Sequence, residues 1–179
     1  MKQTNRTVKN TTTSYSVIKS PVGELLLTAD DSALTGVYFA GCNHVPAESK
    51  QWTRNPQHPV LQSAAKQLAE YFAGKRTAFS ISLHPSGTDF QEKVWREIAR
   101  IPYGKTVSYS HLAKRAGTPD AVRAAGTATG RNPLSIVIPC HRVVGKNGAL
   151  CGFAGGLERK QYLHTLEGLS AKPATTTTR

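Results

Sequence analysis

Residues 136–142 read Ile-Val-Ile-Pro-Cys-His-Arg and place a cysteine directly after a run of β-branched side chains. The run predicts a buried strand, and Pro139 ends it because proline cannot donate to a sheet ladder. Cys140 is then followed by two basic side chains, His141 and Arg142. Neighbouring positive charge lowers the pKa of a thiol, whereas apolar burial raises it. The run therefore marks Cys140 as a candidate nucleophile, in contrast to a cysteine that serves only as a small core residue.

A base for this thiol must come from nearby. Adjacent side chains of an extended segment point to opposite faces, so a direct hydrogen bond between Cys140 and His141 requires a turn or a bridging water. Glu167 closes the next predicted helix, where a carboxylate faces the negative end of the helix dipole and needs a partner. His141 is a candidate for that partner, and a solvated glutamate is the simpler alternative. The apolar face of this helix is expected to consist of Leu157, Leu163 and Leu166.

Two short helices are predicted upstream of the cysteine. The first covers residues 109–116, with Gly117 as its C-cap. The second begins with Thr118 as N-cap and Pro119 at the first helical position, and runs to about residue 129. Such a pair is typical of a helix-turn-helix, although many enzymes contain similar pairs. Before them, apolar residues recurring every four positions predict a helix that starts at Phe90 and stops near residue 101.

The first half of the chain predicts a small α+β unit. Residues 15–19 and 24–29 form a hairpin around a Ser-Pro-Val-Gly turn, and residues 35–39 form a third strand. A helix over 61–72 follows, capped by Gly74. Phe79, Ile81 and Leu83 alternate like one more strand.

Charge is unevenly distributed. The formal net charge is +12; residues 86–168 hold twelve basic and six acidic residues, whereas residues 16–85 hold six and five. A basic half is expected of a protein that faces a polyanion, and a charge that only maintains solubility is the alternative. Apolar residues make up 39% of the chain, enough for a core, without the run of about 18 that a membrane span needs. We therefore expect no membrane association.

The cysteines and the N-terminus bear on location and metal binding. Three cysteines without a Cys-x-x-Cys pair argue against a disulfide framework and a structural zinc site, so no metal or cofactor is expected. The start of the chain lacks an apolar signal core, which favours the cytoplasm. The predicted organisation is a disordered basic tail over 1–13, an N-terminal α+β domain over 14–85, a basic domain over 86–168 that holds the helix pair and the candidate nucleophile, and a disordered tail over 169–179.

Several separated motifs resemble one family, the O6-alkylguanine-DNA alkyltransferases. The strongest is Pro-Cys-His-Arg-Val-Val at 139–144, preceded by Asn132-Pro133 and followed by Gly-Gly-Leu at 155–157 and Leu-Glu-Gly at 166–168. Phe90-Gln91, Val94-Trp95, Ile-Pro-Tyr-Gly at 101–104 and Ser108-Tyr109 match the same family. The resemblance covers about residues 88–168 in order and spacing, and is only loose over 14–87.

The resemblance implies a fold and an activity. The fold is a small N-terminal α/β domain, ribonuclease H-like, followed by a mostly helical domain with the helix-turn-helix and the active-site cysteine loop. The activity is direct-reversal DNA repair, in which Cys140 takes a methyl or larger alkyl group from O6 of guanine as a stable thioether. Each molecule acts once. Activity on O4 of thymine is left open.

The resemblance also assigns roles to residues. His141 and Glu167 form the activating relay, with His141 drawing the thiol proton through a water, and Tyr109 gives a proton to the departing guanine. Arg123 fills the gap left by the flipped nucleotide, and Asn132 is the hinge before the cysteine loop. The small side chains of Ala121 and Ala124 permit close approach of the second helix to the minor groove of double-stranded DNA. The main chain at Val143 and Ala154, together with Tyr109, forms the base pocket.

Other classes of protein remain as alternatives. A non-catalytic alkyltransferase-like protein binds the lesion but lacks the acceptor cysteine. A helix-turn-helix regulator would use Cys140 only structurally, and a cysteine hydrolase would turn over. We expect a monomer in solution, with cooperative assembly on DNA left open.

Overall fold

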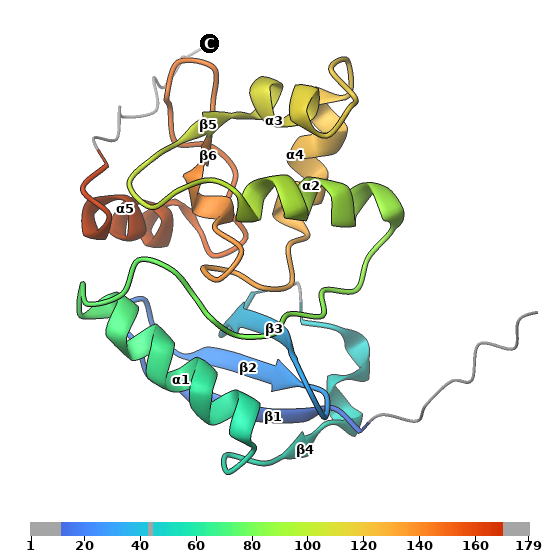
Figure 1. The fold of residues 1–179 in the computed structure, drawn as a ribbon, viewed down its shortest axis with the longest axis vertical. Helices are drawn as coiled ribbons and strands as arrows, with labels where there is room; N and C mark the ends of the chain where they lie inside the picture. The colour runs from blue at the N-terminus through green and yellow to red at the C-terminus, as the bar shows by residue number, and fades with distance from the viewer. Residues whose placement is uncertain (1–11, 43–44, 170–179) are drawn as a thin grey trace, which may run out of the picture.

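The N-terminal part of the chain is a four-stranded sheet covered by one helix (Figure 1). The computed structural model describes residues 12–42 and 45–169. The expected disordered tails lie outside these ranges, apart from residues 12, 13 and 169. Within the described ranges no helix is long and apolar enough to cross a membrane.

The predicted hairpin and third strand are confirmed. The strands β1 (Ser14–Ile18), β2 (Leu25–Ala29) and β3 (Leu34–Phe39) pair antiparallel, and β4 (Thr53–Arg54) adds a parallel pair beside β1. The sheet order is β3-β2-β1-β4, and a short 3-10 helix, η1 (Ala47–Gln51), precedes β4. The first turn closes where Gly23, at φ 96°, donates its N–H to the Ser20 carbonyl at 3.0 Å. Glycine suits this left-handed backbone because it lacks a Cβ.

The helix α1 (Pro59–Phe72) packs its apolar face on this sheet, as the sequence predicts. The strand expected through Phe79, Ile81 and Leu83 is wrong, because only one isolated bridge forms there, between Leu34 and Leu83. The N–H of Ser80 donates instead to the Gln67 side chain of α1 at 2.8 Å. The segment is therefore anchored to a helix side chain rather than to a strand.

The second part is mostly helical. Thr88 and Gln91 form a capping box at the start of α2 (Asp89–Ala99), and the buried Trp95 indole donates to the Ala128 carbonyl of α4 at 2.8 Å. The helices α3 (Tyr109–Arg115) and α4 (Val122–Gly130) pack on each other and on α2. The predicted helix-turn-helix is present.

The start of its second helix was predicted too early. The helix α4 begins after Ala121 rather than after Thr118. The amide of Thr118 donates to the Ala113 carbonyl at 3.0 Å and its hydroxyl to the same oxygen at 3.5 Å. Thr118 therefore closes α3, and Pro119, expected at the first position of the second helix, lies in the turn between the two helices.

The apolar run 136–138 is buried, but it is not a strand. Ile136 has φ 73°, a left-handed conformation that β-branched residues rarely adopt, and the run makes a tight turn. The buried Asn132 holds this turn: its amide donates to the Ile138 carbonyl at 2.8 Å and its oxygen accepts from the Leu134 N–H at 3.0 Å. The side-chain hydrogen bonds of Asn132 thus replace the expected ladder.

After the bend at 136–138, the chain forms a single turn of 3-10 helix, η2 (Cys140–Arg142), which leads into β6 (Val143–Val144). Strand β6 pairs in parallel with β5 (Val107–Ser108), the short strand before α3. The last helix, α5 (Leu157–Leu166), packs against η2.

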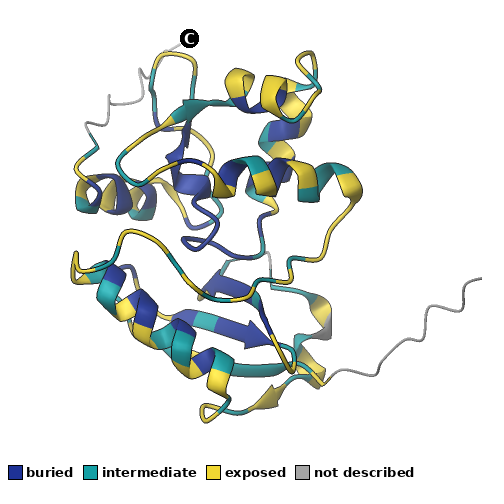
Figure 2. Cartoon of the chain, in the orientation of Figure 1, coloured by how far each residue is buried: buried dark blue, intermediate teal, exposed yellow. Residues whose placement is uncertain are grey.

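The expected apolar face of α5 is partly wrong, since Leu157 is 46% exposed. Its buried stripe is mostly polar and consists of Lys160, Leu163, His164 and, at the C-cap, Glu167. Buried positions are continuous between the sheet part and the helical part (Figure 2), and one apolar cluster joins them.

Candidate active site

Cys140 lies at the start of η2, almost entirely buried. Burial raises the pKa of the Cys140 thiol above its ordinary value, and the Asn132 amide and the Lys160 ammonium offset this rise only in part. The resting side chain is therefore a neutral thiol. Because the thiolate is the reactive form, such a cysteine needs a base to take its proton.

His141 can be that base. Its ring is fully buried, and Nε2 lies 2.7 Å from Oε1 of Glu167. An ionised carboxylate only accepts hydrogen bonds, so Nε2 carries the hydrogen and Nδ1 is unprotonated. Burial lowers the pKa of His141 and keeps the imidazole neutral. Nδ1 is buried without a hydrogen-bond partner among the residues that the structure describes.

Glu167 is held by four residues at once. Tyr71 donates its hydroxyl to Oε1 at 2.7 Å, and the main-chain N–H of Gly104 donates to Oε2 at 3.2 Å. Arg142 donates from Nε to Oε2 at 2.8 Å and from its terminal nitrogen to Oε1 at 2.9 Å. Burial alone would raise the pKa of Glu167, but the hydrogen bonds from His141, Arg142 and Tyr71 hold it well below the ordinary value. The carboxylate is thus ionised in the folded protein.

The buried polar stripe of α5 supports the cysteine turn from behind. Lys160 donates from Nζ to the carbonyls of Val143 at 2.7 Å and Cys151 at 2.9 Å, and His164 donates from Nε2 to the His141 carbonyl at 2.6 Å. Burial lowers the pKa of both Lys160 and His164. These contacts fix the main chain that follows the thiol.

Sequence reasoning gave Arg142 a role as a positive neighbour of the thiol, whereas in the structure its guanidinium pairs with Glu167. Lys160, His164 and Tyr71 were given no role. A usable signal existed for the first two: Lys160, His164 and Glu167 are spaced by four and three residues, so they share one helical face. No comparable signal existed for Tyr71, which lies far from this site in the sequence and on an ordinary apolar helix.

Tyr109, at the start of α3, lies beside the loop that follows β6. Its hydroxyl is 3.3 Å from the carbonyls of both Cys151 and Gly152. Burial raises the pKa of Tyr109, so the phenol keeps its proton at neutral pH. A neutral phenol at this place can give a hydrogen bond to a ligand in exchange for these two long ones.

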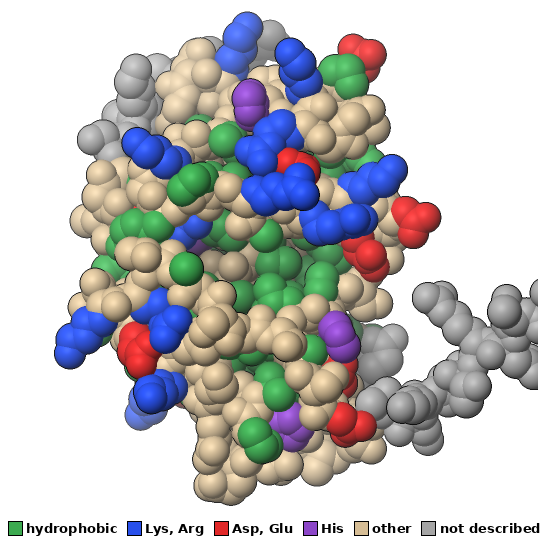
Figure 3. Space-filling view, in the orientation of Figure 1, with side chains coloured by type: hydrophobic (Ala, Val, Ile, Leu, Met, Phe, Trp, Pro, Cys, Tyr) green, Lys and Arg blue, Asp and Glu red, His purple; other side chains and the backbone are tan. Residues whose placement is uncertain are grey.

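The predicted DNA-contact residues lie on α4 and just before it. Arg123 and Ala124 are exposed, and Ala121 is partly exposed. On the face shown in Figure 3, Lys and Arg side chains gather over the helical part. This position agrees with the basic half found in the sequence.

The expected base pocket was to use the main chain of Val143 and Ala154, and the main chain of Val143 is already hydrogen-bonded within the protein. The N–H of Val143 donates to the Cys140 carbonyl, and its own carbonyl accepts from Lys160, so only a second lone pair of that oxygen is free for a ligand. Ala154 is partly buried in the following loop. Across the described ranges no three His, Cys, Asp or Glu side chains form a metal-binding group.

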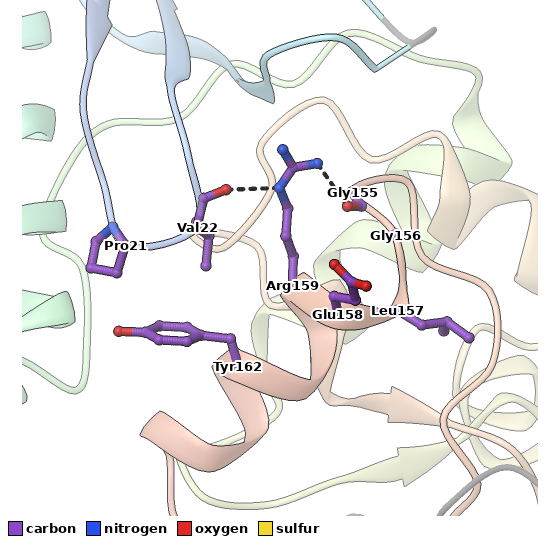
Figure 4. Close-up of a pocket in the computed structure, with 8 residues that line it drawn as sticks. All are labelled: Pro21, Val22, Gly155, Gly156, Leu157, Glu158, Arg159 and Tyr162. Carbon is purple, nitrogen blue, oxygen red and sulfur yellow. Dashed lines mark hydrogen bonds between the residues drawn. The ribbon is translucent and has the colours of Figure 1, made fainter.

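A broad hollow lies where the hairpin between β1 and β2 meets α5 (Figure 4), and Cys140 is not among the residues that line it. Arg159 reaches across it, donating to the Val22 carbonyl at 2.7 Å and to the Gly155 carbonyl at 2.9 Å. Its guanidinium also stands 5.2 Å from the centre of the Phe39 ring. Arg159 therefore links the two parts of the chain across this hollow.

The fold and the site together define a class: helix-turn-helix proteins that carry a buried thiol next to an imidazole–carboxylate pair. Comparison with known families agrees with this description. The family described as "6-O-methylguanine DNA methyltransferase, DNA binding domain" matches residues 89–169, and its "ribonuclease-like domain" matches residues 13–85.

Individual relatives cover most of the chain. The methylated-DNA–protein-cysteine methyltransferase of Mycolicibacterium paratuberculosis is 45% identical over 86% of this chain and 91% of its own length. The constitutive enzyme of Bacillus subtilis is 44% identical over 88% and 97%. The crystal structure of Mycobacterium tuberculosis O6-methylguanine methyltransferase superposes with a TM-score of 0.81 at 42% identity, over 92% of this chain and 98% of that one.

A structure of the M. tuberculosis protein in complex with DNA also gives a TM-score of 0.81 at 42% identity, over 86% of this chain and 92% of that one. The chain belongs to the O6-methylguanine-DNA methyltransferase family, and residues 89–169 are its DNA-binding domain.

The buried histidines predict how stability depends on pH. The pKa values of His141 and His164 are lowered in the folded protein, whereas unfolded histidine titrates near about 6.5. Below that pH the unfolded chain binds more protons, so each histidine lowers the free energy of unfolding by up to about 1.4 kcal/mol per pH unit. Urea unfolding at pH 7.5, 6.5 and 5.5 measures this decline.

Two variants distinguish titration of His164 from a general effect of acid on stability. His164→Gln keeps a donor toward the His141 carbonyl but cannot titrate, so the decline with acid should be shallower than in the wild type. His111→Gln removes an exposed histidine and should leave the decline unchanged. An equal slope for the wild type and His164→Gln would contradict the assignment of His164 as a buried neutral group.

Proposed function

We propose that the protein repairs DNA by direct reversal, moving a methyl or larger alkyl group from O6 of guanine to Sγ of Cys140. The carbon–sulfur bond forms as the carbon–oxygen bond breaks. The thiol proton passes to Nδ1 of His141, through a water, and the departing guanine receives a proton from Tyr109. The product is a thioether, which cannot be released by these groups, so each molecule acts once.

The observation that carries this proposal is that a buried cysteine opens η2 and is followed in the same turn by a buried histidine whose Nδ1 has no hydrogen-bond partner among the described residues. Nε2 is occupied by Glu167, so proton uptake is directed to the other ring nitrogen. The ionised Glu167 then stabilises the imidazolium that forms, in the manner of the carboxylate in a catalytic triad. The η2 turn and the family membership support the same roles.

Access to the lesion requires base flipping. O6 of guanine is inside the stacked duplex, so the nucleotide must be turned out at a cost of a few kcal/mol. We assign Arg123 to the resulting gap, with Ala121 and Ala124 allowing α4 to enter the minor groove. Tyr109, Val143 and Ala154 would surround the extruded base, and Asn132 would act as the hinge that couples α4 to the cysteine turn.

The presence of Cys140 argues against a non-catalytic lesion-binding protein, and the buried relay argues against a regulator with a merely structural cysteine. A cysteine hydrolase would need a second step that frees the sulfur. We propose that the protein acts as a monomer in the cytoplasm. Cooperative assembly on DNA is compatible with this activity.

The acceptor is tested by mass spectrometry of the intact protein after incubation with a duplex that contains O6-methylguanine. The wild type should gain one methyl group on Cys140 and then be inactive. Cys140→Ala should gain none while binding the duplex within about twofold of the wild type, since the thiol contributes little surface. Cys151→Ser, which alters an exposed cysteine, should react like the wild type. Product released beyond one equivalent would contradict a single-use acceptor.

Arg123→Ala tests the flipping role. Repair within a duplex should slow by about tenfold to a hundredfold, because the emptied stack loses a contact worth about 1–3 kcal/mol. Transfer from the free base O6-benzylguanine, which needs no flipping, should remain near the wild-type rate. Arg131→Ala, which removes an exposed arginine just after α4, is the matched control. Equal losses on duplex and free base would remove the assigned role.

A further inference from the structure

The N-terminal part of the chain contributes one side chain to the relay. Tyr71, near the end of α1, is fully buried, and its hydroxyl donates to Oε1 of Glu167 at 2.7 Å. The hydroxyl oxygen of Tyr71 is also 3.5 Å from Nε2 of His141. The hydroxyl therefore lies beside the hydrogen bond that links His141 to Glu167.

Oε1 of Glu167 receives three donors. Besides the Tyr71 hydroxyl these are Nε2 of His141 at 2.7 Å and a terminal nitrogen of Arg142 at 2.9 Å. Each donor draws electron density from the oxygen, so the donors compete for it. The Tyr71 hydroxyl thus weakens the attraction of Oε1 for the imidazole hydrogen, and it restricts where Oε1 can lie.

The ring of Tyr71 is held independently of its hydroxyl. It makes edge or tilted contacts with the rings of Phe72, Phe79 and Tyr103, with centroid distances of 5.5, 5.5 and 6.3 Å. Burial raises the pKa of Tyr71, and the Glu167 carboxylate raises it further, so the hydroxyl remains a donor. Packing places the hydroxyl, and the hydroxyl in turn places the carboxylate.

The charged and titratable groups around the relay come from several elements. Arg142 and His141 belong to η2, Tyr103 to the segment after α2, and His164 and Lys160 to α5. Arg142 also lies 5.6 Å from the centre of the Tyr103 ring. Only Tyr71 among them comes from the N-terminal sheet part.

We propose that Tyr71 is a positioning residue for alkyl transfer, fixing Oε1 of Glu167 and limiting its pull on the imidazole hydrogen, so that the N-terminal part completes the active site. This inference rests on the proposed function. It gives the sheet part a direct role in the chemistry, beyond covering the core.

Tyr71→Phe tests it, because phenylalanine retains the ring and removes only the hydroxyl. Without that donor Oε1 attracts the imidazole hydrogen more strongly, so His141 keeps an added proton to higher pH. The acid limb of the rate–pH profile should therefore move to higher pH. On the acid limb single-turnover methyl transfer should slow by about threefold to tenfold, the size of one hydrogen bond, with duplex binding unchanged.

The matched control is Tyr103→Phe. It removes one hydroxyl that donates to the Leu166 carbonyl at 3.0 Å, next to Glu167 in sequence but outside the relay. Its acid limb should coincide with that of the wild type. A second probe, 3-fluorotyrosine at position 71, makes the phenol a stronger donor and should move the acid limb to lower pH, and it preserves the side chain if Tyr71→Phe fails to fold.

The outcomes distinguish the two proposals. Transfer by the wild type together with an acid limb that neither probe at position 71 moves would overturn the role of Tyr71 alone. An equal slowing at every pH, or the same shift in Tyr103→Phe, would do so as well. Wild-type protein that leaves Cys140 unmodified would overturn the proposed function itself and the inference with it.

Discussion

The buried carboxylate of Glu167 is the interaction on which the rest of the site depends. An isolated charge in the interior costs several kcal/mol, and here it is compensated by a bidentate arginine, an imidazole, a phenol and a main-chain N–H. These donors come from α1, the segment after α2, and η2, so one charge joins elements that are far apart in the sequence. Removing it would leave Arg142 buried without its anion and His141 without its orienting partner. The carboxylate therefore supports the fold and sets the tautomer of the base through the same contacts.

The sequence predicts most of this architecture where local physics decides it. The hairpin, α1, α2 and the helix pair follow from periodicity, caps and glycine positions. The failures occur where side chains replace main-chain partners. Asn132 turns the apolar run 136–138 into a tight bend, Gln67 takes the amide of Ser80, and Thr118 closes α3 instead of opening α4. None of these hydrogen bonds is visible in a hydrophobic pattern.

Local sequence also limited which residues of the active site could be predicted. Cys140, His141 and Glu167 could be named from their residue types and motifs, and the structure brings His141 and Glu167 into contact. The polar stripe of α5 was not predicted, because a buried helix face was expected to be apolar. Lys160 and His164 are instead buried as donors to main-chain carbonyls. Tyr71 could not be found at all, because its contact with Glu167 depends on how the two parts of the chain pack. Tertiary packing, not local sequence, decides which distant residues complete a buried site.

The proposed repair chemistry requires His141 to be a neutral base with its hydrogen on Nε2 and an unprotonated Nδ1 available for the thiol proton. Nitrogen-15 NMR of the ring measures this state directly, since the two nitrogens differ in chemical shift according to which one carries hydrogen. At pH 7 we expect hydrogen on one ring nitrogen only, Nε2, which contacts Glu167. After methylation of Cys140 the same tautomer should return once the guanine has left. A ring protonated on Nδ1, or on both nitrogens at pH 7 before reaction, would contradict the role of His141 as the base.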